Sequence, residues 1–395
     1  MEEEEMKKSL IVLFTFLILV VFIIPVTAEV KIGGIIFTDF YYLNRDKENA
    51  KDWGLGNGTT SYNVTKIQVP NITRLYAKWT DEDNVGMYIE FGIGQNSKRS
   101  NDSINGVELR HAYGWWDINS NLRLIAGKTT TPLSPLNPSQ LLGTRSGSDN
   151  IIGTGFGNLY SCRVAQVRGT YKVNKNIRVA LALVDPNGVA DVVYDKGPWD
   201  WEDKYSTKIP RIDIGVPIYL DWINLYPSAM WQERRVDIPE LAGQKITTLI
   251  TSLGLKTGYG PLIFSAEGNW GKNWGNTFSY MGYTYPGMFS SAGYENGTVK
   301  DTYTYSYWLD LGYKLGIATP HIMYGEMATK YSYLNLDIES KSNFFGFSCP
   351  VQLAKGFSIR PEIMFYDEGD IKATGNEDYP AGRYYIAGAQ FQIIF

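Results

Sequence analysis

Several segments alternate between apolar residues and a face that carries charged and other polar residues. In residues 74–79, Arg74 and Lys78 share one face while Leu75 and Trp79 share the other. If such faces enclose water, the chemistry they offer is attraction and repulsion of ions. Bond-making chemistry has few candidates, because the chain's 2 histidines are far apart and neither lies in a nucleophile motif. We therefore expect no enzyme activity, no metal site and no cofactor.

The same alternation assigns charged residues of both signs to the face that would enclose water, and their numbers are nearly equal. The basic set is Arg74, Lys78, Arg110, Arg123, Arg168, Arg178, Arg211, Lys314 and Arg360. The acidic set is Asp39, Glu90, Glu108, Asp213, Glu267, Asp310, Glu326 and Glu362. Balance predicts weak ion selectivity, although basic residues gathered on one wall would still polarise the lumen. Any single charge can instead be a solvated wall residue in an ion-pair network.

The elements that position these charges are about sixteen segments with period-two alternation, which predict β-strands. Short joints, such as 81–84, 119–120 and 258–260, alternate with longer ones. The longer joints are 43–65, 95–105, 132–157, 187–206, 236–244, 271–301, 329–342 and 368–381. An up-and-down barrel sorts its connections in this way, whereas a soluble sandwich does not. We expect an all-β, antiparallel transmembrane barrel.

The clearest predicted strand, at residues 303–315, has the dimensions of a membrane crossing. Tyrosines mark both ends of one face, at Tyr303 and Tyr313, with Leu309 and Leu311 between them. Ten residue steps at about 3.3 Å, tilted by about 45°, project to about 23 Å, which matches the apolar band between two aromatic girdles. Asp310 falls on the opposite face.

The first 28 residues have the organisation of a secretory signal peptide. Lys7 and Lys8 precede an apolar run that ends at Ala28. We expect residues 1–28 to be cleaved and 29–395 to form the barrel, while an uncleaved anchor and a start at Met6 stay open. A net charge of −4 argues against nucleic acid as a partner. With a mean hydropathy of −0.21 and no second long apolar run, a closed barrel is the remaining way to cross a membrane.

Two adjacent segments and the end of the chain carry a family resemblance. Residues 109–114, LRHAYG, and 124–129, LIAGKT, precede a long proline-rich segment. This arrangement resembles Gram-negative outer-membrane porins, and alternation that ends on Phe395 is similar to the terminus that barrel-assembly machinery recognises. The resemblance implies sixteen strands, a homotrimer in outer-membrane lipid, and passive diffusion of small hydrophilic solutes. The chain lacks the P-E-F-G-G run of the enterobacterial type, so pore size and solute identity do not carry over.

The segment 132–157 corresponds by resemblance to the third extracellular loop, which folds into the pore and constricts it. Its prolines restrict the backbone, and leucines such as Leu136 and Leu141 are too apolar for a freely solvated loop. A loop that stays outside remains the alternative. The predicted pore-lining and constriction residues are Arg74, Arg110, Arg123, Lys128, Arg145, Asp149, Arg168, Arg178, Arg211, Asp213, Glu267, Asp310, Arg360 and Glu362.

A second function stays open at this stage. The insertion 271–301 is rich in Tyr, Gly and Asn, as expected of an adhesin or structural barrel that acts through its extracellular loops. The predicted function is nevertheless a porin-like channel in the outer membrane, reached by secretion through the inner membrane.

The predicted closing strand gives a test of assembly. Replacing Phe395 with Ser, or deleting 391–395, should block membrane insertion but not secretion, because the strand loses its terminal aromatic residue and its pairing surface. The measurement is the yield of heat-modifiable oligomers from membranes. Normal oligomers from the truncated chain would contradict this prediction.

Overall fold

The computed structural model describes residues 29–52, 55, 60–70, 72–95, 104–142, 156–160, 163–186, 205–236, 243–277, 284–295, 298–333, 336–375 and 377–395. The predicted signal peptide, 1–28, lies outside these residues. So do two of the predicted constriction residues, Arg145 and Asp149. Within the described residues, no helix is long and apolar enough to cross a membrane.

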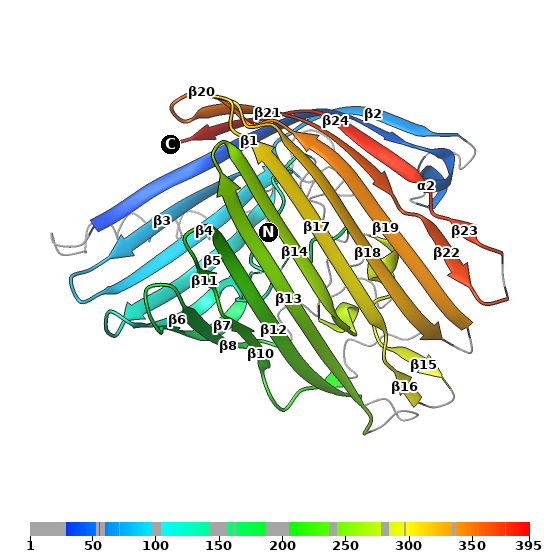
Figure 1. The fold of residues 1–395 in the computed structure, drawn as a ribbon, viewed down its shortest axis with the longest axis horizontal. Coiled ribbons are helices and arrows are strands. Elements are labelled where there is room, and N and C mark those ends of the chain that lie inside the picture. The colour runs from blue at the N-terminus through cyan, green and yellow to red at the C-terminus, as the bar shows by residue number, and fades with distance from the viewer. Residues whose placement is uncertain are drawn as a thin grey trace, which may run out of the picture.

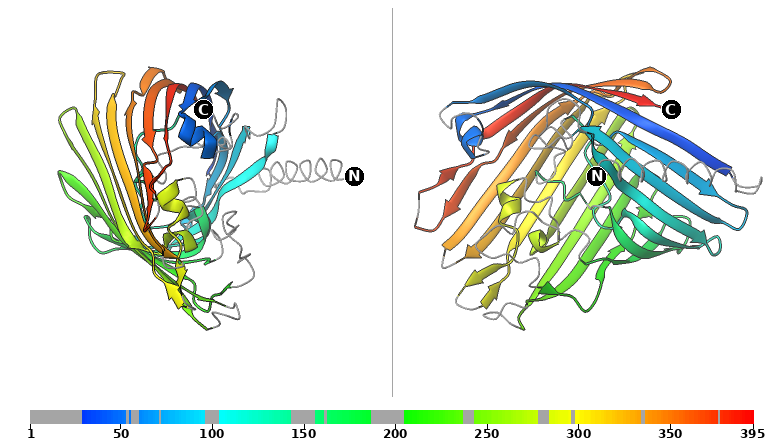
Figure 2. Two further views of the ribbon diagram at one scale, coloured as in Figure 1. Left: turned by 90° about the vertical axis from the view of Figure 1, so that its right-hand side faces the viewer. Right: turned by 180° about the vertical axis from the view of Figure 1, so that it is seen from behind.

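One antiparallel sheet closes on itself to form the barrel (Figures 1 and 2). Its first strand, β1 (Glu29–Arg45), pairs along one edge with its last, β24 (Arg383–Ile394), and Asp39 lies opposite Gln390. Closure satisfies the backbone N–H and C=O groups that an open edge would expose to lipid. The predicted fold class is confirmed as a closed barrel of sixteen antiparallel spans.

The strands between these two are listed here in chain order. The first half comprises β2 (Tyr62–Gln68), β3 (Arg74–Thr80), β4 (Val85–Gln95), β5 (Ile104–Asp117), β6 (Leu122–Thr130), β7 (Arg163–Lys172), β8 (Arg178–Val184), β9 (Tyr205–Ser206), β10 (Arg211–Gly215) and β11 (Ile218–Tyr219). The second half comprises β12 (Ile223–Val236), β13 (Lys245–Tyr259), β14 (Leu262–Lys272), β17 (Tyr303–Tyr313), β18 (His321–Tyr333), β19 (Leu336–Ser348), β20 (Val351–Ala354), β21 (Phe357–Asp367), β22 (Asp370–Ala373) and β23 (Tyr379–Pro380).

Some spans consist of consecutive strands with a local break. β2 and β3 both pair with β1, and β9, β10 and β11 all pair with β12. β19 with β20, β21 with β22, and β23 with β24 form the last three spans. The described residues also contain α2 (Lys47–Asp52), η3 (Trp274–Asn276), α3 (Tyr285–Met288) and a small hairpin of β15 (Gly293–Glu295) and β16 (Thr298–Lys300).

The connections sort by length as predicted, with two exceptions. The predicted long joint 329–342 is wrong, because β18 continues to Tyr333 and β19 begins at Leu336. The joint 368–381 is shorter than predicted, because β22 and β23 pair within it. Polar sequence suggested loops there, but cross-strand pairs such as Lys330 and Glu339, with their charged groups 2.5 Å apart, extend the ladder beyond the apolar band.

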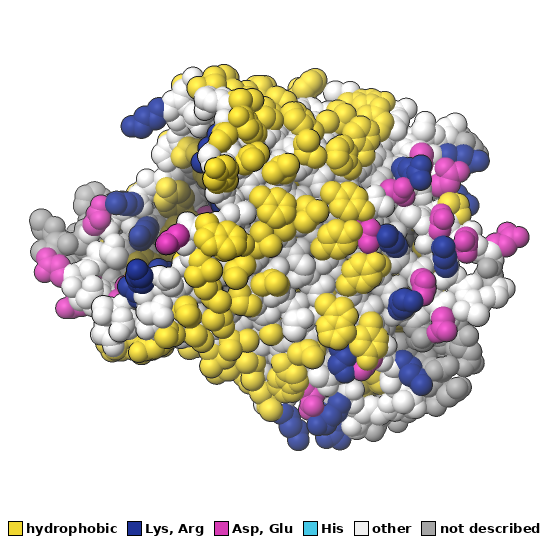
Figure 3. All heavy atoms as spheres, viewed as in Figure 1, with side chains coloured by type: hydrophobic (Ala, Val, Ile, Leu, Met, Phe, Trp, Pro, Cys, Tyr) yellow, Lys and Arg dark blue, Asp and Glu magenta, His cyan; other side chains and the backbone are white. Residues whose placement is uncertain are grey.

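The outer face carries an apolar band. On β17, Tyr303, Leu309, Leu311 and Tyr313 are exposed and Asp310 is buried on the inner side, so the predicted alternation is confirmed. Figure 3 shows hydrophobic side chains spread over the outer wall, with charged side chains gathered towards both rims. This is the surface that a strand-spanned membrane requires.

The two faces predict unequal tolerance of charge. Leu309→Arg places a cation in the apolar band and should cost about 2–4 kcal/mol of folding free energy. Ser265→Arg, on the inner face of β14 beside Asp310, should cost much less. Urea titration of the barrel in detergent or lipid measures both. Equal destabilisation would show that the face assignment of these strands is wrong.

Candidate functional site

The described part of the segment between β6 and β7 lies inside the barrel. Of the predicted constriction loop, residues 132–142 and 156–157 are described, and four buried side chains of this connection pack against the inner wall: Leu133, Leu142, Phe156 and Leu159. Leu133 and Leu159 join Met230 and Ile250, whereas Leu142 and Phe156 join a second cluster. Burying each side chain contributes about 1.5–3 kcal/mol. These contacts explain why so apolar a loop need not be solvated.

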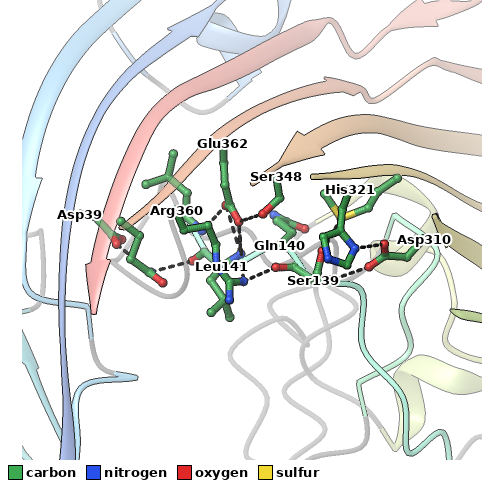
Figure 4. A network of polar contacts seen from close by, with 12 residues as sticks. Asp39, Ser139, Gln140, Leu141, Asp310, His321, Ser348, Arg360 and Glu362 are labelled. Carbon is green, nitrogen blue, oxygen red and sulfur yellow. Dashed lines mark hydrogen bonds and ion pairs between the residues drawn. The ribbon is translucent and has the colours of Figure 1, made fainter. Parts of the chain in front are cut away.

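Three wall carboxylates bind the loop backbone and side chains, and Figure 4 shows two of them, Asp310 and Glu362. Glu267 on β14 accepts bonds from the Ser134 hydroxyl and, at 3.2 Å, from the Leu136 amide. Asp310 on β17 accepts the Ser139 amide at 2.7 Å. Glu362 on β21 accepts the amides of Leu141 and Leu142, the latter at 2.6 Å. Hydrogen bonds to charged acceptors are the stronger kind, so the three acids fix the loop along the wall.

The neighbours of these carboxylates extend the clamp. Arg360 donates to the Ser139 carbonyl oxygen and lies 3.9 Å from Glu362. The His321 Nδ1 lies 2.6 Å from Asp310, and the Ser348 hydroxyl donates to Glu362 at 2.8 Å. Glu267, Asp310 and Glu362 are each at most 5% exposed. Their charges are therefore held under the loop and do not face open water.

The opposite side of the lumen, formed by β3 to β7, carries basic side chains around a recess of about 300 Å³. Arg74, Arg110 and Arg163 line it together with loop residues such as Asn137. Glu90 accepts a bond from Arg110 Nε at 2.7 Å and lies 3.6 Å from Arg74. Among the described residues, Arg110 Nη1 is buried without a hydrogen-bond partner. Of the three arginines that line the described recess, Glu90 pairs with two, which leaves the recess positive.

A β-bulge between β4 and β5 places two adjacent basic residues on the inner face of this wall. The register of β4 and β5 shifts at Glu90 and Phe91, which pair with His111 and Leu109. Arg110 is the extra residue, and it is buried inside the barrel while Leu109 is exposed outside. The bulge brings Arg110 and His111 to the same inner face, where the His111 Nδ1 lies 3.0 Å from the Thr129 hydroxyl.

The remaining predicted residues are placed differently from one another. Arg123, which pairs with Asp117 at 2.6 Å, and Arg178, which lies over the Tyr219 ring, are near the short turns. Arg168 donates to the Thr130 carbonyl oxygen. Arg211 and Asp213 form an ion pair that is almost completely buried beneath the start of the loop.

Two predicted inward residues are on the outer face. Lys128 lies opposite Ala112 and Ala165, and Ala165 alternates on β7 with the buried residues Val164 and Gln166. The prediction that Lys128 lines the pore is therefore wrong. The inward assignment of Glu326 is also wrong, because Glu326 lies opposite Tyr307 and binds outer-face groups.

Glu326 is held by three such groups: the hydroxyls of Tyr305 and Tyr324, at 3.1 and 3.0 Å, and the Lys341 ammonium, at 2.9 Å. Polar partners on the outer face stabilise a carboxylate that the alternation alone placed in the lumen.

Sequence reasoning missed two features of the lumen. Arg163 and Tyr160, whose side chains bond at 2.9 Å, were not predicted to line the recess. The insertion 271–301 was treated as extracellular, but Trp274 is completely buried with Leu133 and Met327. Figure 2 shows η3 and α3 within the outline of the barrel. Apolar residues at inward positions, such as Met230, Met327 and Phe344, could have indicated this. Such residues need apolar partners inside the lumen, which the inserted segments provide.

Comparison with solved structures finds the same fold in outer-membrane proteins. The outer-membrane channel DcaP of Acinetobacter baumannii is 16% identical, with a TM-score of 0.67 over 93% of this chain and 97% of that one. The anion-selective porin from Comamonas acidovorans is 13% identical, with a TM-score of 0.62 over 93% and 100%. OmpT of Vibrio cholerae is 10% identical, with a TM-score of 0.55 over 94% and 99%. No protein-family profile and no curated protein sequence matches the chain.

The carboxylate clamp predicts how the loop can be loosened. Glu362→Ala removes the acceptor of two loop amides, and each buried group left unpaired costs about 1–3 kcal/mol. The loop should become more sensitive to limited proteolysis, and single-channel current should become noisier. Glu339→Ala, which removes an exposed outer carboxylate, is the control. Equal protease sensitivity of the two variants would contradict the role of Glu362.

Proposed function

We propose that this chain forms a water-filled channel across the outer membrane, through which small hydrophilic solutes and ions diffuse passively, with a preference for anions. The observation that supports this most directly is the asymmetric lumen. The loop covers the acidic wall of β14, β17 and β21, and the arginines of β3, β5 and β7 remain around a recess.

Barrel size supports a channel. Closed sheets of about eight strands are filled by their own side chains, whereas those of sixteen to eighteen strands enclose an aqueous channel. Here the loop and the segment around Trp274 fill part of that space by packing on the apolar inner wall. The wall of β3 to β7 keeps charged and hydroxyl-bearing side chains such as Arg74, Tyr88 and Arg110, which is the wall that a hydrated solute would follow.

Sidedness supports the anion preference. The near balance of charges in the sequence predicted weak selectivity, but that count gives every inward charge equal weight. Glu267 and Glu362 accept hydrogen bonds from loop amides. Arg163, in contrast, donates to the neutral hydroxyl of Tyr160, so its charge is not compensated by that bond. Basic side chains that face the pore attract anions. The similarity in fold to a porin described as anion-selective is consistent with this proposal.

The other functions considered receive less support. An adhesin would project its insertions outward, but Trp274 and Ser290 of the long insertion are buried. A hydrolase would need an activated nucleophile beside a base. The Ser139 hydroxyl instead donates to the Met323 sulfur at 3.6 Å. Asp310, which lies 2.6 Å from His321, accepts the Ser139 amide and therefore binds the loop backbone and not a nucleophile.

We also propose the setting of the channel: secretion by a cleaved signal peptide, a homotrimer in outer-membrane lipid, and recognition of Phe395 by the assembly machinery. The aromatic ring of Phe395 is exposed on the outer face, while its backbone exchanges hydrogen bonds with Gly34 on β1. The exposed ring of Phe395 is available to the assembly machinery before the barrel closes, and the backbone of the same residue pairs with β1 once it has closed.

Reversal potentials in a KCl gradient across a planar bilayer test the selectivity. The unmodified channel should favour chloride. The double variant Arg74→Gln, Arg163→Gln should lose much of that preference, since each charge about 4 Å from an ion contributes about 1 kcal/mol even at the dielectric constant of water. Arg383→Gln, which changes an exposed outer arginine, is the control. Absence of conductance, or cation preference in the unmodified channel, would contradict the proposal.

A further inference from the structure

A run of aromatic rings descends the inner wall from the arginine recess. Tyr76 on β3 stacks on Tyr88 of β4 with ring centroids 5.7 Å apart, and Tyr88 lies 5.7 Å from Tyr113 of β5. Tyr113 is followed by Trp115 at 6.0 Å. Across the strands, Tyr76 lies opposite Glu90 and Trp115 lies opposite Gly86, and both of these partners are buried on the inner face. Tyr76, Tyr88 and Tyr113 are partly exposed on this inner face, whereas Trp115 is buried at its end.

Cations bracket the aromatic run at both ends. Arg74 and Arg110 lie at its upper end, in the recess, and Lys78 and Arg123 lie over the Trp115 ring at 5.5 and 5.7 Å from its centroid. The four residue steps from Arg74 to Lys78 span about 13 Å along the strand. A solute that moves down this wall therefore meets the arginines of the recess, then ring faces, then Lys78 and the ion-paired Arg123.

The upper end has the features of a site built for a ligand. Arg110 is 5% exposed, and its unpartnered Nη1 lies among the described residues that line the recess. A buried guanidinium donor without a partner costs free energy that a carboxylate would recover through short charge-assisted bonds. The same recess contains uncharged polar groups that match hydroxyls, such as Thr130 and Asn137. The Tyr88 hydroxyl donates to Glu90 at 2.7 Å, which fixes one ring of the run.

We propose that this wall is a binding track for cyclic sugar acids. Their carboxylate would pair with the arginines, their hydroxyls would bond the polar groups of the recess, and the C–H face of the ring would stack on the electron-rich faces of Tyr76, Tyr88 and Tyr113. A neutral sugar would leave the arginines unused, and an open-chain acid would leave the rings unused. The inference rests on the proposed channel, because it names the solute class that the channel favours.

Current block in planar bilayers tests the track with three probes: glucuronate, which has ring and charge, gluconate, which has charge and an open chain, and glucose, which has the ring alone. Glucuronate should block chloride current at lower concentration than either of the others. Equal block by gluconate would overturn the role of the rings, and equal block by glucose would overturn that of the cations. A channel that conducts KCl without discriminating among the probes would overturn the track alone. No KCl conductance would overturn the channel as well.

A matched pair of variants separates stacking from general effects. Tyr113→Leu removes one ring from the track, and Tyr313→Leu makes the same change on the outer face. Loss of an aromatic contact should weaken glucuronate block by about threefold to tenfold in the first variant and leave the second unchanged. KCl conductance should persist in both, which shows that the barrel has folded. Benzoate is the fourth probe, and tighter block by benzoate than by glucuronate would overturn the sugar assignment in favour of an aromatic acid.

Discussion

The pairing of β1 with β24 is the constraint on which the rest of the structure depends. In lipid, an unpaired backbone edge has no water to bond, so the sheet must close or stay out of the membrane. Closure fixes which face of each strand points outward and thereby assigns every side chain to lipid or lumen. Asp39 and Gln390, directly opposite each other on these two strands, are bonded at 2.8 Å inside the barrel. The seam is therefore stabilised by side chains as well as by the backbone ladder.

A closed barrel of this width has interior volume to fill, and its filling is what makes the lumen asymmetric. The loop cannot lie in the lumen unless its own amides are satisfied, and Glu267, Asp310 and Glu362 provide the acceptors. In doing so they are withdrawn from the pore. The positive character of the opposite wall thus follows from how the loop is held as much as from where the arginines are.

Much of the fold could be predicted from sequence because period two is informative wherever one face meets lipid and the other meets water. β17 is such a strand, and its alternation was correct. On β18 both faces carry apolar residues, since Met323 and Met327 face inward beneath the loop while Ile322 faces outward. The alternation of polar and apolar residues is therefore lost on this strand, and Glu326 was assigned to the wrong face. Lys128 was misplaced for another reason. Proximity to the loop suggested a lumen position, whereas the cross-strand register places it outside.

The central claim is that the loop sets both the width and the polarity of the pore. Single-channel recording of a chain in which 132–155 is replaced by a short Gly/Ser turn tests it most directly, with heat-modifiability confirming that the barrel has closed. Conductance should rise, and the reversal potential should move towards cations, because Glu267, Asp310 and Glu362 are uncovered. An intact barrel with unchanged conductance and unchanged selectivity would contradict the account.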